Sequence, residues 1–185
     1  MARVLLLYAH PAPQRSIANR ALADAVRDLP NVTFHDLYET YPDLLIDIDA
    51  EQDLLMAHDA IVVQHPFYWY SAPSIVKEWL DVVLEHGFAY GAEGRAIAGK
   101  VWMHALTTGG REVAYTPAGT NRYSVHELLR PFEATAALCR CDWRAPFIVH
   151  AAHLLDATAL AQEAQRYRAH ITALAAEPAA QRTNA

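Results

Sequence analysis

Apolar and polar positions fall into blocks along the chain that predict five β-strands. Most of these blocks are continuous apolar runs, a pattern typical of parallel strands that are covered on both faces of a sheet. The predicted strands span residues 4–8, 32–36, 60–64, 100–106 and 143–150. The last of them contains Pro146, which lacks a backbone N–H group and therefore favours an edge position.

Between the predicted strands, apolar residues recur at helical spacing. The predicted helices span residues 17–29, 50–57, 71–84, 125–138 and 154–174. Ser16 and Asp49 are placed to cap the first two helices, and Pro131 is expected to bend or restart the fourth. Residues 176–185 are expected to form a flexible C-terminal tail.

Strands that alternate with helices at this spacing predict an α/β fold. We expect a doubly wound, five-stranded parallel sheet in the order 2-1-3-4-5, with helices on both faces and one domain over residues 1–175. In such a sheet, ligands bind beyond the carboxyl ends of the strands, where the strand order reverses between strands one and three. The loops after strands one, three and four are therefore the candidates for a functional site.

The composition and charge of the chain favour a globular protein and argue against several other classes. The chain has 185 residues, of which 53% are hydrophobic and 19% charged, as expected for a globular domain. Its net charge of −6 argues against a nucleic-acid partner, because such proteins usually present a basic face. No apolar run approaches the roughly 20 residues of a membrane-spanning helix, and the apolar N-terminal segment is too short for a secretory signal. Cys139 and Cys141 form neither a disulfide framework nor a CxxC motif, so we expect a cytoplasmic location.

The loop after the first strand leads into a helix start that is suited to an anion. The opening turn consists of Ser16, Ile17, Ala18 and Asn19. Free backbone N–H groups at such a start, with the helix dipole behind them, bind anions, and His10 or Arg15 could add positive charge. Taken alone, Ser16 has the simpler interpretation of a helix cap. The chain contains neither a GxGxxG fingerprint nor a GxxxxGK[ST] loop.

Four consecutive aromatic residues follow the third strand. They are Phe67, Tyr68, Trp69 and Tyr70. Consecutive side chains in a loop cannot all face one core, so some of these rings should be exposed and available to stack on a flat heterocycle. A packed hydrophobic loop is the alternative interpretation.

The loop after the fourth strand consists of Thr107, Thr108, Gly109 and Gly110. Glycine has no side chain, so the amides of this loop can approach a ligand closely, although an ordinary tight turn would look the same. Together, an anion-binding helix start, an aromatic wall and a glycine loop at one sheet edge describe a site for a phosphorylated flat ring. FMN fits that description best.

Two other chemistries find little support. The ten histidines are scattered along the chain, and the nearest pair, His150 and His153, has no evident third ligand, so no metal site is expected. A hydrolase is not indicated, because the chain has no GxSxG motif.

These motifs resemble those of the flavodoxin-like quinone reductase family, and more narrowly those of the ancillary flavoproteins of glutathione-regulated (Kef-type) potassium efflux. The resemblance extends over residues 3–175. It rests on residues 7–11, 16–19, 36–38, 41–43, 46–48, 51–52, 64–66, 69–71, 77–81, 86–91, 99–100 and 107–110. The resemblance implies a flavodoxin-like fold that binds FMN.

The resemblance also implies a role for each loop. The FMN phosphate and ribityl chain would lie against His10 and residues 16–19, and the ring against residues 67–70. The amides of residues 107–110 would face the pyrimidine edge and stabilise negative charge there. The chain ends before the segment that holds the adenine half of FAD in longer relatives, which favours FMN.

Two residues beyond the glycine loop are implied as catalytic. Tyr115 matches a tyrosine of the family that handles charge and protons on the reduced cofactor, although a tyrosine packed at an interface is the alternative. Asn121 stands where the family has a histidine. An asparagine can orient a water molecule or donate a hydrogen bond, but it cannot relay a proton.

The implied function is that of an FMN-dependent NAD(P)H:quinone oxidoreductase that works by two-electron, ping-pong hydride transfer, with NADH or NADPH as donor. The resemblance also implies a homodimer that docks on the cytosolic domain of a glutathione-gated potassium/proton antiporter, at the cytoplasmic face of the inner membrane. One alternative is a purely regulatory subunit with little turnover. A one-electron, flavodoxin-type carrier is a further alternative, but the short Ser/Thr-rich phosphate loop of such carriers is missing.

Overall fold

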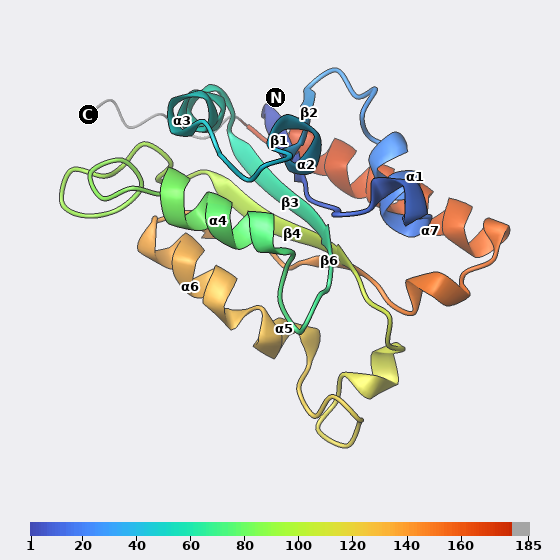
Figure 1. Cartoon of the computed structure of the whole chain (residues 1–185). Helices are drawn as coiled ribbons and strands as arrows, with labels where there is room; N and C mark the ends of the chain where they lie inside the picture. The colour runs from blue at the N-terminus through green and yellow to red at the C-terminus, as the bar shows by residue number, and fades with distance from the viewer. Residues whose placement is uncertain (179–185) are drawn as a thin grey trace.

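The strands form one parallel sheet. In the computed structural model, which describes residues 1–178, their order is β2-β1-β3-β4-β5, and β6 also pairs with β4 (Figure 1). The bounds are Val4–Tyr8 for β1, Val32–Asp36 for β2, Ala60–Pro66 for β3, Val101–Thr107 for β4, Asp142–Trp143 for β5 and Phe147–Val149 for β6. The predicted α/β fold and strand order are confirmed.

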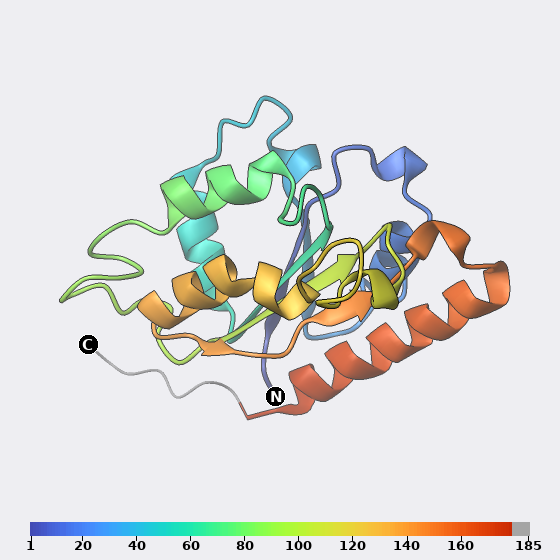
Figure 2. The same cartoon turned by 90° about the horizontal axis from the view of Figure 1, so that it is seen from below.

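Helices cover both faces of the sheet (Figures 1 and 2). One layer contains α1 (Ala18–Asp24) and α7 (Ala157–Ala176); the other contains α2 (Leu37–Thr40), α3 (Ile48–Ala57), α4 (Ser74–Val83), α5 (Val125–Leu128) and α6 (Arg130–Leu138). Within β1, Val4 and Leu6 pack toward the α1 layer. Leu5 and Leu7 pack toward the opposite layer, and all four residues are fully buried. The continuous apolar run is therefore a strand that is buried from both sides.

The pairing register brings three strand ends to one edge of the sheet. Tyr8 at the end of β1 pairs with Gln64 of β3, and Pro66 at the end of β3 pairs with Thr107 at the end of β4. The loops that follow β1, β3 and β4 therefore start side by side, as the sequence predicted.

Two predicted helix caps are wrong. Ser16 does not cap α1, because a 3₁₀ turn at Pro13–Arg15 ends on it; α1 begins at Ala18 and has no side-chain cap. Asp49 lies inside α3, which starts two residues earlier than predicted. Its cap is Asp47, whose Oδ1 accepts a hydrogen bond from the Ala50 amide at 3.1 Å.

The predicted fifth strand is broken. Residues 143–150 contain the end of β5 and all of β6, and both short strands pair with the same edge of β4. The break includes Pro146, which cannot donate to a ladder. The predicted helix over 125–138 restarts as expected, since α5 ends at Leu128 and α6 begins at Arg130, next to Pro131.

The expected tail over 176–185 lies mostly outside the described residues. Ala176 is the last residue of α7, and Glu177 forms an ion pair with Arg144 at 3.0 Å, so these two residues are not part of a free tail. Among residues 1–178, no helix is both long and apolar enough to span a bilayer.

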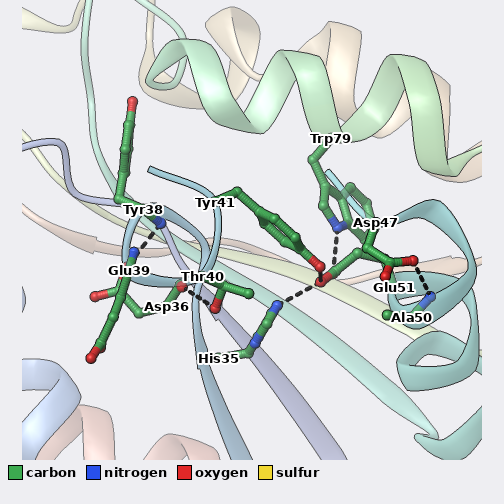
Figure 3. A network of polar contacts seen from close by, with 10 residues as sticks. All are labelled: His35, Asp36, Tyr38, Glu39, Thr40, Tyr41, Asp47, Ala50, Glu51 and Trp79. Atoms are coloured by element: carbon green, nitrogen blue, oxygen red, sulfur yellow. Dashed lines mark hydrogen bonds and ion pairs between the residues drawn. The ribbon is translucent and has the colours of Figure 1, made fainter. Parts of the chain in front are cut away.

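A buried carboxylate joins β2, α3 and α4 (Figure 3). Glu51 Oε1 accepts hydrogen bonds from His35 Nε2 at 2.6 Å and from the Tyr41 hydroxyl at 2.7 Å. Its Oε2 accepts one from Trp79 Nε1 at 2.7 Å. Burial alone would raise the pKa of Glu51, but the hydrogen bonds from His35, Trp79 and Tyr41 outweigh it and hold the pKa below its usual value. Because Trp79 lies on α4, the network also positions the helix that follows the aromatic loop.

Candidate functional site

Direct hydrogen bonds hold the three loops together at the sheet edge. Asn19 Nδ2 donates to Thr107 Oγ1 at 2.7 Å, which joins the start of α1 to the end of β4. Gln64 Nε2 donates to the carbonyl of Asn19 at 2.8 Å, and the Phe67 amide donates to the carbonyl of Thr107 at 2.8 Å. The ring of His10 lies 6.4 Å from that of Tyr68. The predicted convergence of the loops is therefore present.

His10 contributes a hydrogen-bond donor to this edge. It is buried, and its Nδ1 accepts a hydrogen bond from the Ala12 amide at 3.1 Å, so the ring proton lies on Nε2. Burial lowers the pKa of His10. This shift favours the uncharged imidazole and therefore disfavours the positive charge that the sequence suggested for His10.

The start of α1 offers both donors and unpaired acceptors. No side chain caps the backbone amides of the first turn of α1. Ser16, Ala18 and Asn19 are buried, whereas Ile17 is exposed. Within residues 1–178, the buried Asn19 Oδ1 and Gln64 Oε1 have no hydrogen-bond partner. Buried acceptors of this kind fit a ligand that carries hydroxyl groups, such as the ribityl chain of FMN.

The aromatic loop is a strained turn. Trp69 and Tyr70 have φ values of 50° and 62°, and the Ser71 amide donates to the carbonyl of Tyr68 at 2.9 Å, which makes a type I′ turn without glycine. Each left-handed position costs about 1–2 kcal/mol for such residues. The turn keeps the rings outside the core: Tyr68 and Tyr70 are exposed, Trp69 is 91% exposed, and only Phe67 is half-buried. This strain, at a predicted binding loop, favours the functional interpretation over a packed loop.

A cavity of about 380 Å³ lies between the aromatic loop and the glycine loop. Among its lining residues are Phe67, Trp69, Tyr70, Gly109, Gly110, Tyr115 and Asn121. Within the described chain, the amides of Gly109 and Gly110 donate to no protein acceptor. The Thr108 amide, by contrast, is held by the carbonyl of Val149 at 2.9 Å. The loop is thus fixed to β6, and two of its donors remain available.

Tyr115 and Asn121, the two residues with an implied catalytic role, both line this cavity. The Tyr115 ring lies 6.0 Å from the ring of Phe67. Asn121 Oδ1 accepts a hydrogen bond from the Tyr70 hydroxyl at 3.2 Å, so its side chain links the two loops.

Sequence reasoning missed four residues at this site. Gln64 carries one of the unpaired acceptors, and its signal was a polar residue in an otherwise apolar strand. Ala114 and Thr120 line the cavity and have no distinctive pattern in the sequence. His150 was considered only as a metal ligand, but it contacts Thr108. Among the described residues, no three His, Cys, Asp or Glu side chains converge as a metal site.

Known relatives match this chain over most of its length. The family described as having a flavodoxin-like fold matches residues 2–171. The glutathione-regulated potassium-efflux system ancillary protein KefG of Pectobacterium carotovorum subsp. carotovorum (strain PC1) is 55% identical over 165 residues, which are 89% of this chain and 90% of that protein.

Solved structures share the fold. The general stress protein 14 of Treponema denticola, in complex with FMN, superimposes with a TM-score of 0.87 at 38% identity over 93% of this chain and 99% of its own. An NADPH-quinone reductase of P. pentosaceus gives 0.83 at 30% identity, over 91% and 96%. A chain described as a thermophilic tryptophan halogenase of Streptomycin violaceusniger gives 0.88 at 44%, over 90% and 97%. These three structures are named for different activities, so the shared fold does not by itself identify the activity of this chain. The sheet order and the match over nearly the whole chain agree: this protein belongs to the flavodoxin-like family, among homologues of the KefG ancillary proteins.

Proposed function

We propose that this protein is an FMN-dependent NAD(P)H:quinone oxidoreductase. The observation that carries the proposal is the cavity between the aromatic and glycine loops, which has free amides on one side and exposed rings on the other. A solved relative at 38% identity holds FMN, and another at 30% is named a quinone reductase. When bound, FMN would supply two-electron redox chemistry between a nicotinamide and a quinone.

Each part of the site has a defined task in this proposal. The amides at residues 17–19 hold the phosphate, and the acceptors on Asn19 and Gln64 hold ribityl hydroxyls. Phe67, Trp69 and Tyr70 form a wall for the ring. The amides of residues 109–110 stabilise negative charge at the pyrimidine edge. The nicotinamide and the quinone use the remaining space in turn, which is a ping-pong scheme.

The direct test is purification followed by an assay. We expect a yellow protein that contains FMN and oxidises NADH or NADPH only when a quinone is added. A colourless protein that takes up no FMN and shows no turnover would overturn the proposal.

The variant Gly109→Val is expected to weaken FMN binding by about 100-fold, which corresponds to roughly 2.7 kcal/mol. A Cβ at Gly109 meets no atom within 4 Å, and the backbone there has no positive φ, so the free protein should tolerate the side chain. The valine would fill space that the ring edge needs beside the loop amides. Quenching of FMN fluorescence on titration measures the affinity.

The control for this variant is Ala118→Val, which also introduces a valine, at an exposed position of the segment after the glycine loop. It should retain the wild-type affinity for FMN, and both variants should retain the wild-type midpoint of urea unfolding. If Gly109→Val binds FMN as tightly as the control does, the cofactor lies elsewhere.

A regulatory role is the second part of the proposal. It is supported by the 55% identity to a protein named as an ancillary component of potassium efflux. In this role the chain docks, as a homodimer, on the cytosolic domain of a potassium/proton antiporter at the inner membrane. The exposed rings of Tyr68, Trp69 and Tyr70 suit burial against a second copy.

The two roles can be separated with the same variant. A pull-down with the antiporter's cytosolic domain tests docking, and potassium efflux in cells tests activation. Efflux that is activated equally by wild type and by Gly109→Val would favour a purely regulatory subunit. Failure of the wild type to bind the antiporter domain would exclude the regulatory role.

A further inference from the structure

A second cavity lies beside the candidate cofactor cavity. It encloses about 500 Å³, and its ionisable lining residues are Glu112, Tyr115, His126, His150, Glu163 and Arg166. Tyr115 lines both cavities and therefore forms the wall between them. A group that changes charge beside Tyr115 in the second cavity is therefore separated from the cofactor cavity by this ring.

His150 is held against the glycine loop from the side of the second cavity. Its Nδ1 lies 3.1 Å from Thr108 Oγ1, and that hydroxyl donates its own hydrogen to the carbonyl of Gly110 at 2.8 Å. The hydroxyl must therefore accept from the imidazole, which places the ring proton of His150 on Nδ1. The amides of Ala151 and Ala152 donate to the carbonyls of Gly110 and Thr108, each at 3.0 Å. Ala151 has a φ of 50°, a costly value for alanine that its surroundings impose.

The other ring nitrogen of His150 is available to titrate. Within residues 1–178, Nε2 has no protein partner, and the side chain lines the second cavity. Burial lowers the pKa of His150, whereas Glu112 raises it and His126 lowers it. The charges that α7 presents, Glu163 and Arg166, are paired with each other at 2.9 Å. Proton uptake by His150 would thus change the charge of this cavity.

The proposed reaction takes up a proton, and the described residues that line the cofactor cavity include no histidine, carboxylate or amine. The overall reaction is NAD(P)H + H⁺ + quinone → NAD(P)⁺ + hydroquinone, so each turnover takes up one solvent proton. Asn121 cannot hold a proton, and its Oδ1 already accepts from Tyr70. The His150 ring, in contrast, packs against the Tyr115 ring with centroids 5.7 Å apart.

We infer that His150 is the ionisable positioning residue of this site, where it fixes the glycine loop through Thr108 and takes up a solvent proton at Nε2 when negative charge arrives at the cofactor. The proton neutralises that charge from behind Tyr115 and returns to solvent in the second half of the cycle, when the quinone receives the hydride and a solvent proton. The inference rests on the proposed cofactor and reaction.

The test compares FMN-loaded wild type with His150→Asn. Asparagine keeps a donor for Thr108 but cannot titrate, so FMN affinity should stay within about threefold of wild type. His150→Asn should lower the proton uptake that accompanies two-electron reduction, by no more than about one proton per FMN. A pH indicator in weak buffer between pH 6 and 7 measures this uptake. In His150→Asn, the plot of the reduction potential of FMN against pH should also lack the change of slope that titration of His150 causes in the wild type.

Two further variants make the test specific. His153→Asn alters an exposed histidine three residues away and should leave proton uptake unchanged. His150→Ala also removes the donor to Thr108 and should weaken FMN binding by about tenfold. Equal proton uptake in wild type and His150→Asn overturns the inference and leaves the proposed function standing. A wild type that binds no FMN overturns both.

Discussion

Glu51→Gln is expected to lower the free energy of unfolding by about 3–5 kcal/mol. The carboxylate accepts hydrogen bonds from His35, Tyr41 and Trp79, and a neutral amide has a single acceptor oxygen to offer them. Tyr41 is 7% exposed and Trp79 is 1% exposed, so a donor that loses its partner cannot turn to water. Urea unfolding at pH 7, followed by circular dichroism, measures the change.

The matched control is Asp53→Asn, which neutralises an exposed carboxylate on the same helix. Exposed substitutions of this kind change stability by about 0.5 kcal/mol or less. If Glu51→Gln costs no more than this control, the buried network does not stabilise the fold.

Lowering the pH from 7 to 5 is expected to destabilise the protein by several kcal/mol, in part through His65 and His104. Both side chains are fully buried in the sheet. His65 Nδ1 donates to the carbonyl of Pro66 at 2.9 Å, so its Nε2 accepts from His104 Nδ1 at 2.9 Å. Burial lowers the pKa of His65 to about 4. Burial and the neighbouring His65 lower the pKa of His104 well below its ordinary value.

The sign of this pH effect follows from proton binding. Below about pH 6.5 a histidine in the unfolded chain takes up a proton, while the folded pair stays neutral. The contribution to stability is therefore complete above pH 6.5 and is lost as the pH falls toward 4. Each histidine contributes up to about 1.4 kcal/mol per pH unit.

Urea unfolding at pH 7, 6 and 5 measures this slope. His104→Asn keeps a donor for His65 but removes one titrating group, so the contribution of the pair to the slope should fall by about half. The exposed control His126→Asn should keep the wild-type slope. A common slope for wild type and His104→Asn would refute this assignment.

Much of the fold could be predicted from local pattern. Continuous apolar runs such as residues 60–64 indicated strands buried on both faces, and the alternation with helices indicated the order 2-1-3-4-5. The prediction of a helix cap at Ser16 was wrong because two neighbouring segments compete for this residue. Ser16 had the chemistry of a cap, but the 3₁₀ turn ahead of α1 ends on it.

The sequence predicted where the candidate site lies, but it predicted the exposure and protonation of the side chains there only in part. Residues 67–70 had to leave some rings exposed because they are consecutive, and Trp69 is indeed exposed. The lowered pKa of His10 results from its burial in the folded chain, which no spacing in the sequence indicates.

The sequence by itself determined the first four strands, which loops start at the carboxyl edge of the sheet, and to which family the chain belongs. These properties follow from short-range patterns, since side chains alternate along a strand and connections in doubly wound sheets follow few rules. Only the tertiary structure decided that Glu51 accepts a hydrogen bond from Trp79, that His65 bonds to His104, and that His150 reaches Thr108. Each of these pairs joins residues at least 28 positions apart, so the contact and the protonation state that depends on it exist only once the chain is packed.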